Sequence, residues 1–167
     1  METLKKQMVE INQLCNEIDG IYHDIAQNYG LSDSVYWILY ILYSSDAPVS
    51  QIELCSDWYY SKQTVNSSIT TMRKKNWIAL EVVPGTRNRK HIVLTECGRD
   101  FCVKVIGETQ EIEETALSRM AKEERDRFIS LFRISNQYLR EEYEKNTPWS
   151  SFTNRSKERS YACFCGI

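Results

Sequence analysis

Residues 61–94 decide the fold, and they read SKQTVNSSITTMRKKNWIALEVVPGTRNRKHIVL. The serine at position 61 fits the N-cap of a helix that extends to about residue 75. At about 100° per residue, three apolar side chains share one face of that helix and predict its buried side: Val65, Ile69 and Met72. The other side predicts a polar, exposed stripe: Gln63, Asn66, Ser67, Thr70 and Lys74. Residues 62–75 contain no acid, although surface helices are often rich in Glu and Lys.

A hairpin with a basic tip follows this helix. Residues 77–83 and 91–94 are rich in β-branched and aromatic side chains, so each predicts a strand. The turn between them, PGTRNRK at 84–90, carries three cations and no acid.

Two further helices are expected before residue 61. An apolar segment at about 33–44 ends at the breaker SSDAP of residues 44–48. Ser50 and Glu53 then have the spacing of a capping box, which predicts a short helix over 51–57. Over about residues 33–95 the predicted elements are a helix, a short capped helix, a second capped helix and a basic hairpin. This order is typical of a winged helix-turn-helix. In that fold the second capped helix enters the major groove of DNA, where amides such as Gln63 and Asn66 can read adenine edges.

Long helices are predicted on both sides of this lobe, over about 4–28 and 96–145. The first has a heptad line of apolar residues: Leu4, Met8, Ile11, Cys15, Ile18, Tyr22 and Ile25. A helix capped by Thr95 has its own apolar line: Phe101, Val105, Ile112, Ala116 and Met120. A last helix over about 122–145 carries an inner side of Phe128, Phe132, Tyr138 and Tyr143. Such narrow apolar faces predict dimerisation. Residues 146–167 lack hydrophobic periodicity, so we expect them to form a C-terminal tail.

Composition narrows the class of protein. The chain has 167 residues and a net charge of −2, yet residues 58–95 contain seven bases and one acid. A local basic segment of this kind predicts binding to a polyanion. The alternative is that these charges form a solvent-exposed face that binds no partner. No apolar run approaches the roughly 20 residues of a membrane span, and no secretory signal opens the chain, so we expect a cytoplasmic protein. The cysteines are expected to be reduced, with only Cys163 and Cys165 exposed.

The sequence resembles the MarR (multiple-antibiotic-resistance regulator) family. The similarity to that family's recognition helix lies in QTVNSSI at 63–69, together with KKNWI at 74–78, where the helix ends. The family's Leu-Thr-x-x-Gly motif is matched within IVLTECG at 92–98. The resemblance covers about residues 5–145. It implies one domain over 1–145 of a mainly α (α+β) fold and a homodimeric transcription factor, often a repressor, that binds pseudo-palindromic DNA and is often released by small ligands. The family's wing usually carries Asp-x-Arg, whereas Thr86 and Asn88 stand there in this chain.

These observations define the predicted site and its alternatives. The residues expected to contact DNA from the helix are Ser61, Lys62, Gln63, Thr64, Asn66, Ser67, Thr70, Arg73 and Lys74. Those expected from the wing are Thr86, Arg87, Asn88, Arg89 and Lys90. The predicted partners are double-stranded DNA, a second copy and a small aromatic effector. Aromatic residues such as Tyr22 and Trp37 suit either an effector pocket or core packing.

We expect no catalysis, metal or cofactor, because the chain shows no nucleophile–base pair, phosphate loop or metal-binding acid cluster. Two alternatives use the same fold. One is a winged-helix module that binds proteins, and the other is an architectural DNA-binding protein that takes no ligand.

Overall fold

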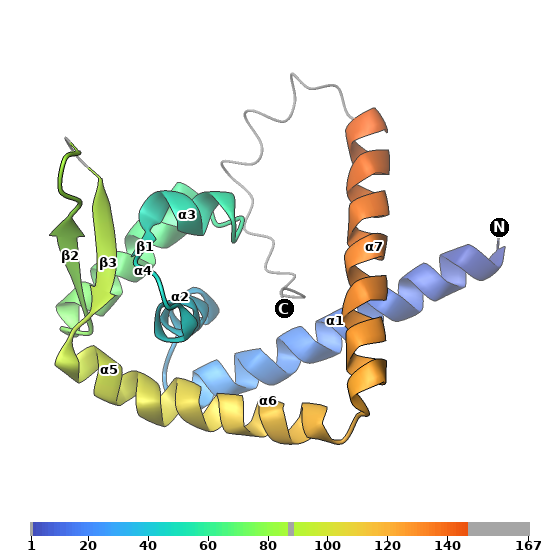
Figure 1. The fold of residues 1–167 in the computed structure, drawn as a ribbon, viewed down its shortest axis with the longest axis horizontal. Coiled ribbons are helices and arrows are strands. Elements are labelled where there is room, and N and C mark those ends of the chain that lie inside the picture. The colour runs from blue at the N-terminus through green and yellow to red at the C-terminus, as the bar shows by residue number, and fades with distance from the viewer. Residues whose placement is uncertain (1, 87–88, 147–167) are drawn as a thin grey trace.

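The structure is a computed structural model that describes residues 2–86 and 89–146. Its helices are α1 (Glu2–Asn28), α2 (Asp33–Ser44), α3 (Gln51–Ser56), α4 (Lys62–Lys74), α5 (Glu96–Cys102), the π-helix η1 (Val103–Gly107), α6 (Glu108–Ser118) and α7 (Lys122–Asn146). Its strands are β1 (Val49–Ser50), β2 (Ile78–Val82) and β3 (Lys90–Leu94) (Figure 1). The fold is therefore mainly helical with one small sheet, as the sequence predicts.

The sheet has the strand order β1-β3-β2, and both pairs are antiparallel. The predicted hairpin pairs Ile78 with Leu94 and Val82 with Lys90. Strand β1 is the one strand that the sequence did not predict. It has only two residues and exists because Val49 lies opposite Ile92 of β3, a contact that no local pattern reveals.

The predicted helix starts are confirmed by their hydrogen bonds. The Ser50 hydroxyl accepts from the Glu53 amide, while the Glu53 carboxylate accepts from the Ser50 amide, which completes the capping box. Ser61 caps α4 and Thr95 caps α5 in the same way, each accepting from the amide three residues later at 3.0 Å. Each cap satisfies an amide that its helix cannot pair internally.

Helix α2 is the centre of the core. Tyr36, Ile38 and Leu39 are fully buried, and the helix contacts α4, β3, α5 and η1 (Figure 1). The predicted inner face of α4 is confirmed, because Val65, Ile69 and Met72 are all buried. Among the described residues, no helix is both long and apolar enough to cross a membrane.

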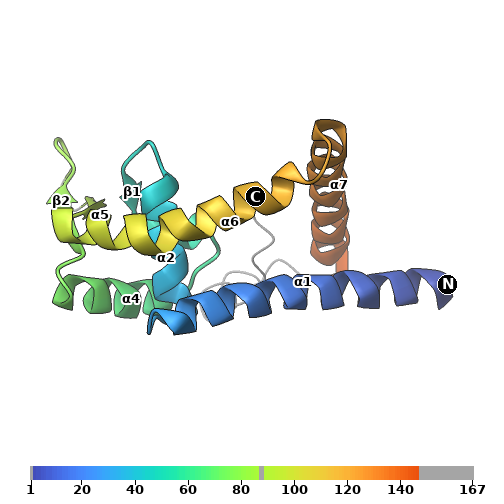
Figure 2. The same ribbon diagram turned by 90° about the horizontal axis from the view of Figure 1, so that it is seen from below.

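The apolar lines of α1 and α7 are largely exposed in the single chain. Leu4 is 70% exposed, whereas Cys15 is buried and Tyr22 and Ile25 are half-buried. In α7, the inner side predicted from Phe128, Tyr138 and Tyr143 is also exposed. Figure 2 shows α1 extending well beyond the winged lobe, so much of its length has no lobe to pack on. These faces are uncovered in the single chain, so the dimerisation expected from them stays a prediction.

The helix predicted to run without interruption after Thr95 contains a π-helical segment. Its buried residues include Cys102, Val105 and Ile106, and Thr109 follows in α6. Ile112, predicted to face inward, is instead 63% exposed. A π-helical turn holds an extra residue, so the side chains after it are rotated relative to a continuous α-helix.

One statement about thiols also needs correction. Cys97, in the first turn of α5, is exposed, whereas the sequence suggested exposure only for Cys163 and Cys165. Those two residues lie outside the described part of the chain. Cys15 and Cys102 are buried as expected, and Cys55 is half-buried.

Candidate nucleic-acid interface

The start of α4 uses two of the predicted contact residues for its own cap. Ser61 is only 6% exposed, and its hydroxyl accepts from the Thr64 amide and lies 2.8 Å from the Thr64 hydroxyl. These hydroxyls therefore fix where α4 begins. They position the side chains of the next turn rather than forming part of the exposed stripe.

The end of α4 is held by a Schellman motif. Asn76 has a φ of 57°, and its amide bonds to the Arg73 carbonyl at 3.0 Å. The Trp77 amide bonds to the Met72 carbonyl at 2.9 Å, which reverses the chain into β2. Asparagine tolerates the left-handed conformation better than most residues, so the Asn76-Trp77 step links α4 firmly to the hairpin.

A buried serine sets the rotation of α4 about its axis. Ser68 is 2% exposed, and its hydroxyl donates to the Ser34 hydroxyl of α2 at 3.0 Å. The hydroxyl of Ser34 also lies 3.3 Å from that of Ser32, the N-cap of α2. The sequence did not predict that Ser68 is buried, because serine is a polar residue. Its position in α4 between the buried Val65 and Met72 is the one local indication of burial.

The outward side of α4 is polar, exposed and free of acids, as predicted. Seven of the predicted contact residues lie on it: Lys62, Gln63, Asn66, Ser67, Thr70, Arg73 and Lys74. The Ser67 hydroxyl donates to the Thr64 carbonyl, and the Thr70 hydroxyl donates to the Asn66 carbonyl. With their protons used in the helix, these hydroxyls offer acceptor lone pairs to a partner. The amides of Gln63 and Asn66 offer both donors and acceptors.

A residue of α3 supports this stripe. The Gln51 side-chain amide donates to the Asn66 side-chain oxygen at 3.5 Å. Gln51 was not among the predicted contact residues, because the 15-residue separation gives no local signal.

The hairpin projects as a wing beyond the body of the lobe (Figure 1). Next to its turn the Val83 amide bonds to the Arg89 carbonyl at 2.9 Å, and Gly85 takes a φ of 76° in the turn. The Thr86 hydroxyl donates to the Val83 carbonyl at 2.8 Å, so it serves the turn. Arg89 and Lys90 are exposed. The predicted contacts Arg87 and Asn88 lie outside the described residues.

The wing and the start of α3 are electrostatically coupled. Hydrogen bonds from Ser50 hold the pKa of Glu53 below its usual value, and the positive charges of Arg89 and His91 lower it further. Glu53 therefore stays ionised at neutral pH in its capping box.

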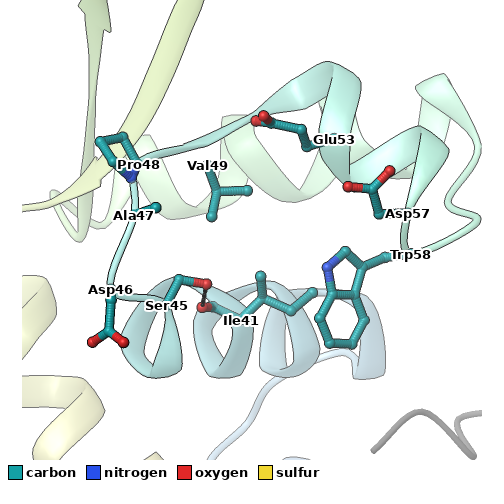
Figure 3. A pocket seen from close by; sticks show the side chains of 9 residues that line it. All are labelled: Ile41, Ser45, Asp46, Ala47, Pro48, Val49, Glu53, Asp57 and Trp58. Atoms are coloured by element: carbon teal, nitrogen blue, oxygen red, sulfur yellow. Dashed lines mark hydrogen bonds between the residues drawn. The ribbon is translucent and has the colours of Figure 1, made fainter.

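An open pocket of about 350 Å³ lies between α2 and α3 (Figure 3). Three of its nine lining residues are acids, Asp46, Glu53 and Asp57, and Trp58 closes one end. These carboxylates disfavour an aromatic acid, and none of the predicted DNA contacts lines the pocket. In the part of the chain that the structure describes, no three His, Cys, Asp or Glu side chains are grouped to hold a metal ion.

Comparison with known proteins agrees with this geometry. The sequence model of the MarR family matches residues 29–87, from the end of α1 into the wing. No curated protein sequence matches the chain.

Several solved structures share the fold. A MarR family regulator from Neisseria meningitidis has a TM-score of 0.73 at 19% identity, covering 88% of this chain and 100% of its own. A putative MarR family transcriptional regulator from Listeria monocytogenes, complexed with 26mer DNA, has a TM-score of 0.68 at 15% identity, covering 92% and 97%. The S. aureus MepR–DNA complex has a TM-score of 0.65 at 17% identity, covering 80% and 97%.

The capped helix pair, the positioned α4 and the β2–β3 hairpin define a winged helix-turn-helix protein. At such low identities the matched structures establish the fold alone. The match to the MarR family model covers residues 29–87, which include α2, α3, α4, β1 and β2.

Proposed function

We propose that the protein is a homodimeric transcriptional regulator, most simply a repressor, that binds a pseudo-palindromic operator. The observation that carries this proposal is the acid-free outward side of α4 beside a basic wing. Two proteins of the same fold, from Listeria and S. aureus, were solved as DNA complexes, which supports a DNA ligand here. In this proposal the whole of residues 1–145 acts as one unit in the cytoplasm.

The two parts of the surface have different tasks in this proposal. Helix α4 enters a major groove, where Gln63 and Asn66 in its first turns reach base edges. Lys74 and Arg73, in the last turn, bind phosphates. The wing follows the adjacent backbone or minor groove through Arg89 and its neighbours, which adds affinity with little base preference.

Replacing Arg89 by alanine is expected to weaken binding to every duplex and to reduce the slope of log affinity against log salt by about one unit. The physical reason is that one fewer phosphate contact releases fewer counterions. Titrations of cognate and scrambled duplexes over a salt series measure both effects. A larger loss on A-tract DNA would instead place Arg89 in the minor groove, and an unchanged slope on all duplexes would remove it from the interface.

Dimerisation is proposed to cover the exposed apolar faces of α1 and α7. Large apolar side chains on α1 include Leu4, Ile11, Leu14, Ile18 and Ile21, and those on α7 include Phe128, Leu131, Ile134, Tyr138 and Leu139. Contiguous apolar surface of this kind marks an interface. We expect sedimentation to show a dimer at micromolar concentration. A monodisperse monomer would contradict the proposal.

Release by a small aromatic effector is part of the proposal, although no residue is assigned to that ligand. The aromatic side chains near α1 and α2 pack mostly on one another. The Tyr22 and Trp37 rings are 4.6 Å apart, and the Tyr36 and Trp37 rings are 5.3 Å apart. In the described residues these rings serve as core, which is one of the two roles that the sequence allowed.

Selection of duplexes from a randomised pool tests the proposed function. The proposal predicts that the selected sites contain two inverted half-sites whose centres are about one helical turn apart. Enrichment of asymmetric sites or of no sequence at all would count against a dimeric operator-binding protein. The second result would favour a protein-binding or architectural role.

A further inference from the structure

A single carboxylate, that of Glu113, joins three helices: α1, α2 and α6. Glu113 of α6 accepts a hydrogen bond from the Tyr22 hydroxyl of α1 at 2.6 Å, and another from the Tyr40 hydroxyl of α2 at 2.7 Å. The two bonds go to different carboxylate oxygens, so each oxygen holds one helix. Both distances are well within the range of O–H···O hydrogen bonds.

The two phenols are suited to act as permanent donors. Burial, together with the bond to Glu113, raises the pKa of both Tyr22 and Tyr40 above the usual value, so their protons stay on at neutral pH. Their rings also pack on Trp37, with centroids 4.6 and 5.4 Å away. The orientation of each hydroxyl is therefore set by packing as well as by the carboxylate.

The three helices belong to different parts of the molecule. Helix α2 contacts α4 and is bonded to it through Ser34 and Ser68, so it moves with the DNA-reading lobe. Helix α1 carries an exposed apolar face, and α6 leads into α7, which carries another. Two further bonds join α6 to its neighbours: the Tyr29 hydroxyl, just after α1, donates to Glu108 at 2.6 Å, and the Gln110 amide donates to the Ser44 hydroxyl of α2 at 2.8 Å.

The connection between α5 and α6 gives the bonds at Glu113 their significance. The π-helix η1 separates α5, which follows the wing, from α6. Hydrogen bonding in a π-helix is less regular than in an α-helix, and such segments often occur at functional positions. The angle between the lobe and α6 is thus held by side chains beyond η1 as well as by the backbone.

We propose that Glu113 is a positioning residue that, through Tyr22 and Tyr40, sets the angle between the DNA-reading lobe and the helices that carry the dimer. This inference rests on the proposed function. In a dimer on two half-sites, that angle determines the distance between the two α4 helices, which must be about 34–36 Å to match one turn of DNA. In this proposal Glu113 affects the distance between the two α4 helices of the dimer and contacts no base.

The double substitution Tyr22→Phe/Tyr40→Phe tests this assignment, because it removes both donors and keeps both rings. Tyr43→Phe is the matched control: it removes a hydroxyl from α2 that does not contact Glu113. The full chain is titrated with duplexes chosen by wild-type selection, with the same duplexes carrying one extra base pair between half-sites, and with a single half-site. Circular dichroism melts show that each variant is folded, and Tyr22→Phe alone serves as a milder second variant.

We expect the wild type and Tyr43→Phe to lose about tenfold in affinity when one base pair is inserted, and the double variant to lose less than about threefold. Single half-site affinity should stay within about twofold for all three proteins. An unchanged insertion penalty in the folded double variant would overturn the inference, and so would an equal loss on the single half-site. If the wild type itself shows no insertion penalty, the dimeric operator-binding function fails and the inference fails with it.

Discussion

Replacing Gly98 by alanine is expected to lower the free energy of unfolding by about 3 kcal/mol or more. This is among the largest losses expected from adding one methyl group anywhere in the chain. A Cβ atom at this position would lie 1.8 Å from the Trp77 carbonyl oxygen and 2.6 Å from its carbon. Both are backbone atoms, so neither can rotate away. The Trp77 carbonyl also accepts from the Thr95 amide at 3.0 Å, which ties it to the start of α5.

Thermal or urea unfolding measures this effect, and Gly20→Ala provides the control. A Cβ at Gly20 meets nothing within 4 Å and lies inside α1, so that substitution should stabilise the protein by about 0.5–1 kcal/mol. A Gly98→Ala variant as stable as the wild type would show that α5 does not approach β2 closely. The resemblance to Leu-Thr-x-x-Gly at residues 94–98 thus has a physical cause: the threonine caps α5 and the glycine lets it pass Trp77.

Replacing Gln63 or Asn66 by alanine is expected to cost about 1–3 kcal/mol on the cognate site and much less on scrambled DNA. Both side chains are exposed on the outward side of α4, and each amide can both donate to and accept from a base edge. The loss should appear as relaxed sequence preference rather than as a general weakening, in contrast to Arg89→Ala.

Thr71→Ala is the matched control for these two variants. Thr71 is exposed on the same helix, but its hydroxyl donates to the Ser67 carbonyl and it lies outside the predicted stripe. It should leave both affinities nearly unchanged. Equal effects of Gln63→Ala and Thr71→Ala would show that the outward side of α4 reads no bases.

The lobe could be predicted from the sequence because its signals are local. The serines at 50 and 61 and the threonine at 95 cap helices through atoms three residues away, and the structure confirms all three. The face of α4 that packs inward follows from helical periodicity alone. The wing follows from two β-rich runs around a turn.

Features that depend on distant partners could not be predicted in this way. Strand β1 requires β3, Ser68 requires Ser34, and the bonds at Glu113 require side chains from two other helices. The π-helix at 103–107 changes which residues face inward, and so Ile112 was placed on the wrong side. The apolar lines of α1 and α7 were visible in the sequence and predict dimerisation, but periodicity does not reveal how a second copy would lie against them.

The most direct test of the central claim is the affinity of the wild-type protein for a selected duplex and for its scrambled counterpart between 50 and 200 mM salt. The account predicts at least about a 10³-fold preference for the selected duplex, and affinities for both that fall steeply with salt because phosphate contacts release counterions. Equal affinity for the two duplexes, or affinity that does not change with salt, would contradict a winged helix-turn-helix that reads DNA through α4 and the wing.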